Sequence, residues 1–241
     1  MRGRPKEKFL VLDVEGNSTC LPYNIGYIVA DNVGNIYQKR SIALPYAVWQ
    51  NLLNSLETGL CKEMHLKNTK DILTDYENNA KNRKYKCISI ESFWILFTSD
   101  IQKYKIKKLY AYNVAFDNSA LSRLLGARYE MLGLEIRDIM SAVVHSRLLH
   151  PNYLQFCDRH GYLTEKGNYR YSAEIVYRYL KGESYADFEE EHTGLADVMI
   201  EYEILLWALK SGKKQVWSCI CAWKKFQQYV EETGYQRWLP F

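Results

Sequence analysis

The sequence lacks any apolar run that approaches the roughly 20 residues needed to span a bilayer. Its first residues, MRGRPKEKF, are basic, but they lead into a strand-like segment rather than into the apolar core of a signal peptide. We therefore expect a soluble, cytoplasmic protein that has no membrane as a partner.

A disulfide framework is also missing. The chain has six cysteines without regular spacing, at Cys20, Cys61, Cys87, Cys157, Cys219 and Cys221. Reduced thiols are therefore expected. Cys157, His160 and the Cys219-x-Cys221 pair are residue types that zinc uses as ligands. We favour a simpler interpretation, in which the cysteines are small buried hydrophobes and His160 is a surface residue.

There is no strong charge of one sign. The formal net charge is +4 with a pI of 8.6, which does not by itself indicate a nucleic-acid partner. The distribution is uneven. Residues 62–86 carry seven Lys or Arg against four acids, residues 210–241 carry six against two, and residues 183–191 carry five acids and no base. A basic surface beside an acidic pocket suits a polyanion held near bound cations. From charge alone, the simpler interpretation is that these three segments form unrelated surfaces exposed to solvent.

Internal repeats and low-complexity linkers are absent too. The 241 residues suit one α/β domain with a helical appendage. Residues 61–86 are predicted to be a partly ordered insertion or a mobile loop. Apolar periodicity and turn residues predict strands at 9–14, 24–30, 36–44, 108–113 and 134–138. They predict helices at 47–56, 89–103, 117–125, 139–149, 152–159, 172–180, 195–209 and 216–230.

The order of these elements predicts a mixed sheet flanked by helices. We expect a single domain over residues 1–241, with a core at about 9–210 and a C-terminal helical extension at 211–241. The terminal helix is expected to pack on the domain, on a partner or on a second copy of the chain rather than to bind nucleic acid.

The first candidate site residues are Asp13 and Glu15, at the end of the strand FLVLDV. Side chains two apart on a strand share a face, and burying two unpaired carboxylates is costly. A divalent metal with oxygen ligands neutralises such a pair. The alternative is a strand end that has reached solvent, with both acids hydrated. The pattern D-x-E is weak on its own.

A second candidate segment, AYNVAFDNSAL, contains Asn113, Phe116 and Asp117. A short apolar strand ends at Asn113, and Asp117 lies where the next helix begins. The alternative role for Asp117 is that of an ordinary N-cap.

The third segment, EEHTGLADVMIEYEIL, places His192 and Asp197 around a helix start in the most acidic part of the chain. Asp197 is expected on the same helix face as Ile200 and Glu201. An isolated histidine at such a position is usually a surface residue.

In this order the three motifs make the sequence similar to the DnaQ-like, or DEDD, superfamily of 3′–5′ exonucleases, in its histidine-containing DEDDh branch. The matching patterns are D-x-E at 13–15, N-x-x-x-F-D beginning at Asn113 and H-x-x-x-x-D at 192–197. The resemblance covers about residues 9–209. It implies a ribonuclease H-like fold, with a five-stranded mixed sheet in which the second strand is antiparallel.

The resemblance also implies hydrolysis with two Mg²⁺ or Mn²⁺ ions, about 3.5–4 Å apart. In the family scheme, Asp13 bridges both metals. Glu15 and Asp197 serve the metal that holds the attacking water, and Asp117 serves the leaving-group metal. His192 is the general base, which suits a side chain with a reference pKa of about 6.5.

Candidate substrate-binding residues are less well defined. The family often has threonine after the D-x-E glutamate, whereas this chain has Gly16 followed by Asn17. Backbone N–H groups of such a loop can approach a substrate closely. Asn113 and Phe116 of the second motif, and Tyr23 near the first, complete the set.

The resemblance implies a metal-dependent 3′–5′ exonuclease that trims 3′ ends, with single-stranded DNA as the expected substrate. An exoribonuclease remains open, because the same site serves both sugars. A nucleic-acid-binding module of the same fold without catalysis is the other alternative. Any role in repair or proofreading is expected in trans. A bacterial or phage setting is compatible with this reading.

Overall fold

The structure is a computed structural model that describes residues 7–16, 22–44, 74, 78, 81–82, 84–218 and 222–233. The helix predicted at 47–56, most of the predicted insertion at 61–86, and Asn17 lie outside these described residues.

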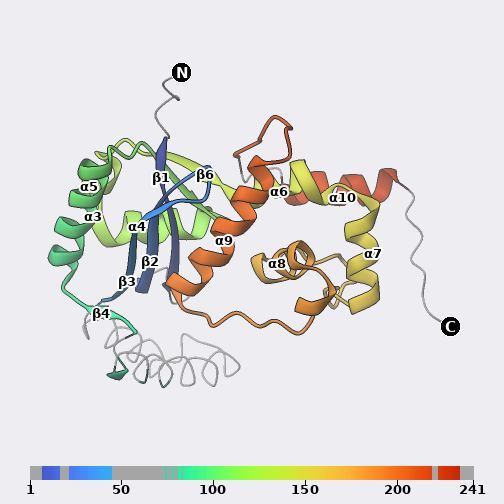
Figure 1. Ribbon diagram of the computed structural model, residues 1–241, viewed down its shortest axis with the longest axis horizontal. Helices are drawn as coiled ribbons and strands as arrows, with labels where there is room; N and C mark the ends of the chain where they lie inside the picture. The colour runs from blue at the N-terminus through green and yellow to red at the C-terminus, as the bar shows by residue number, and fades with distance from the viewer. Residues whose placement is uncertain are drawn as a thin grey trace.

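A mixed sheet with strand order β4-β3-β2-β1-β5-β6 forms the centre of the described structure (Figure 1). β2 runs antiparallel to both of its neighbours, whereas the β1–β5, β5–β6 and β3–β4 pairs are parallel. The strands are β1 (Lys8–Gly16), β2 (Pro22–Asp31), β3 (Ile36–Ala43), β4 (Lys86–Cys87), β5 (Lys108–Ala111) and β6 (Glu135–Asp138).

The sheet has six strands, so the predicted count of five was wrong. The additional strand, β4, is only two residues long and pairs with the end of β3. The Ile88 N–H extends this edge by donating to the Ala43 carbonyl (3.1 Å). Two residues cannot show an apolar alternation, and β4 follows a polar, basic segment, so no sequence pattern marks it.

Helices cover both faces of the sheet (Figure 1). One face packs against α3 (Ile90–Tyr104) and α4 (Ala115–Leu125). The other face packs against α9, which lies across β1 and β2. The hydrophobic core on this side of the sheet also includes residues of the other helices that follow β6. The helices that follow β6 include α6 (Ile139–Val143), a π-helical turn (Val144–Leu148), α7 (Pro151–His160), α8 (Ala173–Lys181), α9 (Gly194–Leu209) and α10 (Ala222–Glu232). Short helices also lie at Ala127–Glu130 (α5) and Glu183–Tyr185.

The helix predicted at 89–103 is confirmed as α3. The Ser89 hydroxyl accepts a hydrogen bond from the Ser92 N–H (3.1 Å), which caps the helix as the sequence indicates. Phe93 and Phe97 are fully buried against the sheet. Burying a side chain of this size stabilises the fold by about 1.5–3 kcal/mol, so tertiary packing holds the helix in place.

The C-terminal helix begins later than its predicted start at Val216. Residues 214–218 are not helical, and α10 begins at Ala222. The Asp138 N–H at the end of β6 donates to the Trp217 carbonyl (3.1 Å), so the chain contacts the sheet before it turns into the helix. Phe226, 2% exposed, anchors α10 in the core. In the described ranges, no helix combines the length and hydropathy that crossing a bilayer requires.

Candidate metal centre and active site

β1 carries the first two candidate residues on the face that α9 covers. Phe9 and Val11 on this strand are buried in the core beneath α9. Because side chains two apart share a face, Asp13 and Glu15 continue the same row at the carboxyl end of the strand. One Asp13 oxygen, Oδ2, is buried without a hydrogen-bond partner among the described residues. The alternative of a fully hydrated strand end therefore does not hold for Asp13.

A glycine–glycine contact sets the position of α9. A Cβ atom on Gly26 of β2 would lie 2.0 Å from the Gly194 carbonyl carbon, so the two backbones touch. The Asn24 Oδ1 atom accepts a hydrogen bond from the Gly194 N–H (2.8 Å). This contact fixes the first turn of α9 on the sheet, and Asp197 follows in that turn.

Gly26→Ala is expected to lower the free energy of unfolding by about 3 kcal/mol, because a side chain here must push α9 away from β2. Urea unfolding measures the change. Ser41→Ala, opposite Gly26 on β3, is the control and should change stability by less than about 0.5 kcal/mol. A Gly26→Ala protein as stable as the wild type would contradict the close contact.

Asp117 lies in the first turn of α4, which begins at Ala115. Its Oδ1 atom accepts a hydrogen bond from the Val14 N–H of β1 (2.9 Å), and the side chain is only 3% exposed. The N-cap position is Val114, so the alternative role of Asp117 as an N-cap was wrong. The carboxylate instead joins α4 to β1 between Asp13 and Glu15.

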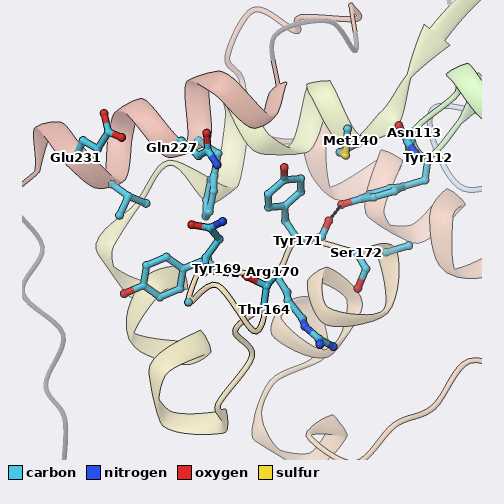
Figure 2. Close-up of a pocket in the computed structure, with 15 residues that line it drawn as sticks. Tyr112, Asn113, Met140, Thr164, Tyr169, Arg170, Tyr171, Ser172, Gln227 and Glu231 are labelled. Carbon is cyan, nitrogen blue, oxygen red and sulfur yellow. Dashed lines mark hydrogen bonds between the residues drawn. The ribbon is translucent and has the colours of Figure 1, made fainter.

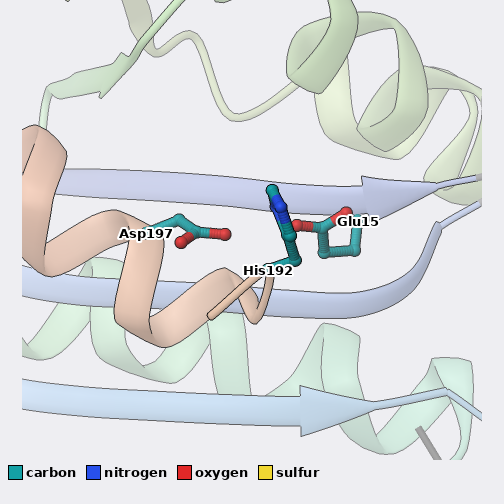
Figure 3. A group of neighbouring side chains, drawn as sticks. All are labelled: Glu15, His192 and Asp197. Carbon is teal, nitrogen blue, oxygen red and sulfur yellow. The ribbon is translucent and has the colours of Figure 1, made fainter. Parts of the chain in front are cut away.

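His192 lies just before α9, and its ring faces the carboxylates of Glu15 and Asp197 (Figure 3). One ligand atom from each of the three residues lies within 4.8 Å of the others. His192 is exposed and has a left-handed backbone with φ 49°. Its imidazole is therefore open to solvent, whereas Asp13 and Glu15 are half-buried and Asp117 and Asp197 are buried.

Two further acids lie near these residues, and one of them, Glu201, completes the group. Glu201 is buried one helical turn after Asp197, and its Oε2 atom accepts a hydrogen bond from the Tyr112 N–H (3.2 Å). Glu190, before α9, is half-buried. The spacing of Asp197 and Glu201 in the sequence indicates that they share a helix face. The contact between Glu201 and the backbone of Tyr112, just after β5, is visible only in the folded structure. We call Asp13, Glu15, Asp117, Asp197 and Glu201 the acid cluster.

Four carboxyl groups of the acid cluster have raised pKa values, because burial and the neighbouring acids disfavour their charged forms. Burial raises the pKa of Asp117 to about 7 and, with help from Glu190 and Glu15, that of Asp197 to about 8. Burial and neighbouring acids also raise the pKa values of Asp13 and Glu201. Among the described residues, no Lys or Arg forms an ion pair with the cluster.

The donor atoms fit a hard divalent cation. Asp13 Oδ2 and Asp197 Oδ1 are both buried without a hydrogen-bond partner in the described structure. Carboxylate oxygens are the ligands that Mg²⁺ and Mn²⁺ prefer, and a cation would relieve the repulsion among them. The exposed imidazole of His192 adds a nitrogen at the edge, so the site is not exclusively an oxygen site.

Without divalent cations, the protein is expected to lose stability as the pH rises from about 4 to about 8. The unfolded chain releases the protons of Asp117 and Asp197 near their ordinary pKa of 3.8, whereas the folded protein holds them to about 7 and about 8. The unfolded state therefore binds fewer protons in this window, and stability falls as pH increases.

Mg²⁺ should reverse this loss. We expect it to raise the melting temperature by less than about 1 °C near pH 5 and by at least about 5 °C near pH 8.5, measured by scanning fluorimetry. Asp197→Asn should flatten the pH dependence. A Mg²⁺ effect of equal size at both pH values would contradict the proposed cation site.

The predicted substrate-binding residues that the structure describes differ in their exposure and in their contacts with the acid cluster. Gly16 ends β1 at an irregularity in its pairing with β2, and Asn17 lies outside the described residues. Asn113 is exposed with φ 56°, and Phe116 is half-buried in α4. The Tyr23 hydroxyl is directed at Glu15 Oε2 (3.5 Å), so this tyrosine contacts the cluster itself.

All five residues predicted to be catalytic therefore meet at the carboxyl end of β1, although they come from three distant segments. Compared with protein-family models and with curated proteins, the chain matches none.

Proposed function

We propose that this protein is a metal-dependent 3′–5′ exonuclease of the DnaQ-like, DEDDh type, with a ribonuclease H-like fold. The observation that carries the proposal is the convergence of the three motifs. Asp13 and Glu15 of β1, Asp117 of α4 and Asp197 of α9 surround one strand end, and His192 lies beside them. The mixed sheet with an antiparallel β2 agrees with the expected fold.

In this proposal, Asp13, Glu15, Asp117 and Asp197 hold two Mg²⁺ or Mn²⁺ ions. When bound, the ions supply charge that stabilises the attacking and leaving oxygens of the scissile phosphate. The acids are mounted on three rigid elements, β1, α4 and α9, which keep them in place without the ions. The close Gly26–Gly194 contact fixes the distance between β2 and α9.

His192 is the proposed general base. Its imidazole is exposed yet lies beside Glu15 and Asp197, so a ring nitrogen can accept the proton of the attacking water and release it to solvent. The acids are less suited to this step, because Asp13 Oδ2 and Asp197 Oδ1 are buried away from the solvent that takes up the proton.

The expected substrate is a single strand of DNA with a free 3′ end. The test is incubation of the purified protein with 5′-labelled DNA and RNA oligomers, single-stranded or paired, with Mg²⁺, Mn²⁺ or EDTA. Shortening from the 3′ end only with the metals supports the proposal. Faster shortening of RNA would assign an exoribonuclease. Intact strands of every kind, together with measurable binding, would instead identify a non-catalytic binding module.

A further inference from the structure

A pocket of about 800 Å³ lies next to the acid cluster, between α10 and residues 164–173 (Figure 2). We call it the α10 pocket. Its wall includes Tyr112 and Asn113, which follow β5 directly. β5 is the parallel neighbour of β1 and pairs Tyr110 with Val11, so Tyr112 and Asp13 each follow two residues after this pair. Since the Tyr112 N–H donates to Glu201, the pocket and the acid cluster share a wall.

Aromatic side chains form much of the lining. Tyr169 and Phe226 are buried, whereas Tyr112 and Tyr171 are half-buried. The rings of Tyr171 and Phe226 are 5.2 Å apart between centroids. Such an arrangement offers an apolar surface with exposed ring area, which suits a flat aromatic ligand.

The walls are held in place by hydrogen bonds to the backbone of residues 164–173. The Tyr153 hydroxyl donates to the Arg170 carbonyl (2.7 Å), and the Tyr112 hydroxyl donates to the Tyr171 carbonyl (Figure 2). Because the segment is fixed from two sides, a ligand does not have to order it on binding.

The rim of the pocket is polar and carries charge of both signs, because Arg170 and Glu231 are exposed in its lining. Asn113, Asn168 and Gln227 are exposed there, and each side-chain amide offers both donors and an acceptor. Lys224 and Lys225 are exposed on α10, the helix that forms one wall. Amides can pair with the edge of a base, and the lysines favour the phosphates of the strand that carries it.

We propose that the α10 pocket binds an unpaired nucleobase of the strand whose scissile phosphate lies at the acid cluster. This rests on the proposed nuclease function for the position of the strand. The volume lies within the range of pockets that enclose small organic ligands. A free nucleotide carries the same base and phosphate as a strand, so the test must distinguish a base within a strand from the base of a free nucleotide.

The test measures binding without hydrolysis. Fluorescence anisotropy follows a labelled oligothymidylate in EDTA, with Asp197→Asn as the parent protein so that one acid is neutralised. Tyr171→Ala is expected to weaken binding about tenfold, because it removes a stacking surface. Tyr171→Phe keeps the ring and should stay within about twofold of the parent. Equal affinities for Tyr171→Ala and the parent would overturn the proposal.

A second pair of variants does not depend on the packing of Tyr171. Gln227→Glu places a negative charge at the pocket rim and is expected to weaken binding about fivefold at low salt. Gln102→Glu makes the same change on α3, where the residue is also exposed, and should have little effect. The same loss from both substitutions would show general repulsion and contradict a local site.

Competition with thymidine monophosphate identifies the source of the base. If the oligomer binds through Tyr171 and the mononucleotide competes only at far higher concentration, the strand is the ligand. Equal potency of the mononucleotide would assign the pocket to a free nucleotide and overturn the strand assignment. No step of this experiment measures hydrolysis, so the binding results can be interpreted even if the wild-type protein is not a nuclease. Conversely, unchanged oligonucleotide binding by Tyr171→Ala would not contradict the exonuclease proposal.

Discussion

Asp13→Asn is expected to reduce hydrolysis of a 5′-labelled single strand by at least about a thousandfold at saturating Mg²⁺. The amide keeps the shape of the side chain but removes the charge at the centre of the acid cluster. Asp13 is the residue whose carboxyl interacts with Glu201, Asp117, Glu15 and Asp197 together. Initial rates from denaturing gels measure the loss.

The same substitution should stabilise the metal-free protein. Burial and the surrounding acids raise the pKa of Asp13, so its ionisation opposes folding near pH 8. Replacing it with a neutral amide is expected to raise the melting temperature in EDTA by roughly 3 °C. Loss of activity with a gain in stability cannot come from unfolding.

Asp100→Asn provides the matched control. Asp100 is also buried, but it pairs with Arg40 (3.0 Å) and accepts from the Tyr27 hydroxyl (2.9 Å). Neutralising it should cost about 2 kcal/mol or more of stability and leave the activity per folded molecule intact. If Asp13→Asn instead lowered stability in EDTA and kept its activity, the acid cluster would be structural rather than catalytic.

The sequence predicts the local parts of the fold well. Each of the three motifs lies within one segment, where a strand end or a helix start fixes which residues share a face. Asp13 with Glu15, and His192 with Asp197, are therefore visible from spacing alone. The cap at Ser89 and the turn at Gly126 likewise depend on neighbouring residues, and α3 and α4 end where predicted.

Features that depend on contacts between distant segments were not predictable in the same way. β4 consists of two residues that pair with the end of β3. The start of α10 is delayed because Trp217 contacts β6. Glu201 has a visible spacing from Asp197, yet its role depends on the Tyr112 backbone. The α10 pocket combines four segments of the chain, and no single motif marks it.

His192→Asn is expected to lower the single-turnover rate by about 10²–10⁴-fold while oligonucleotide binding stays within about twofold. Asparagine is the suitable replacement because residue 192 has φ 49°, a left-handed conformation that asparagine tolerates better than alanine. The exposed ring contributes little to packing, so the loss should appear in the chemical step alone. Rapid-quench kinetics and anisotropy separate these two quantities.

Added imidazole should restore part of the rate of His192→Asn, because the missing function is proton acceptance at a solvent-exposed position. His160→Asn is the control: this histidine pairs with Glu183 (2.7 Å) at the end of α7, and its loss should leave the rate unchanged. Wild-type turnover in His192→Asn would remove the histidine from the mechanism. A slow variant that imidazole cannot restore would point instead to a role for His192 in positioning Glu15 and Asp197, the two acids beside its ring.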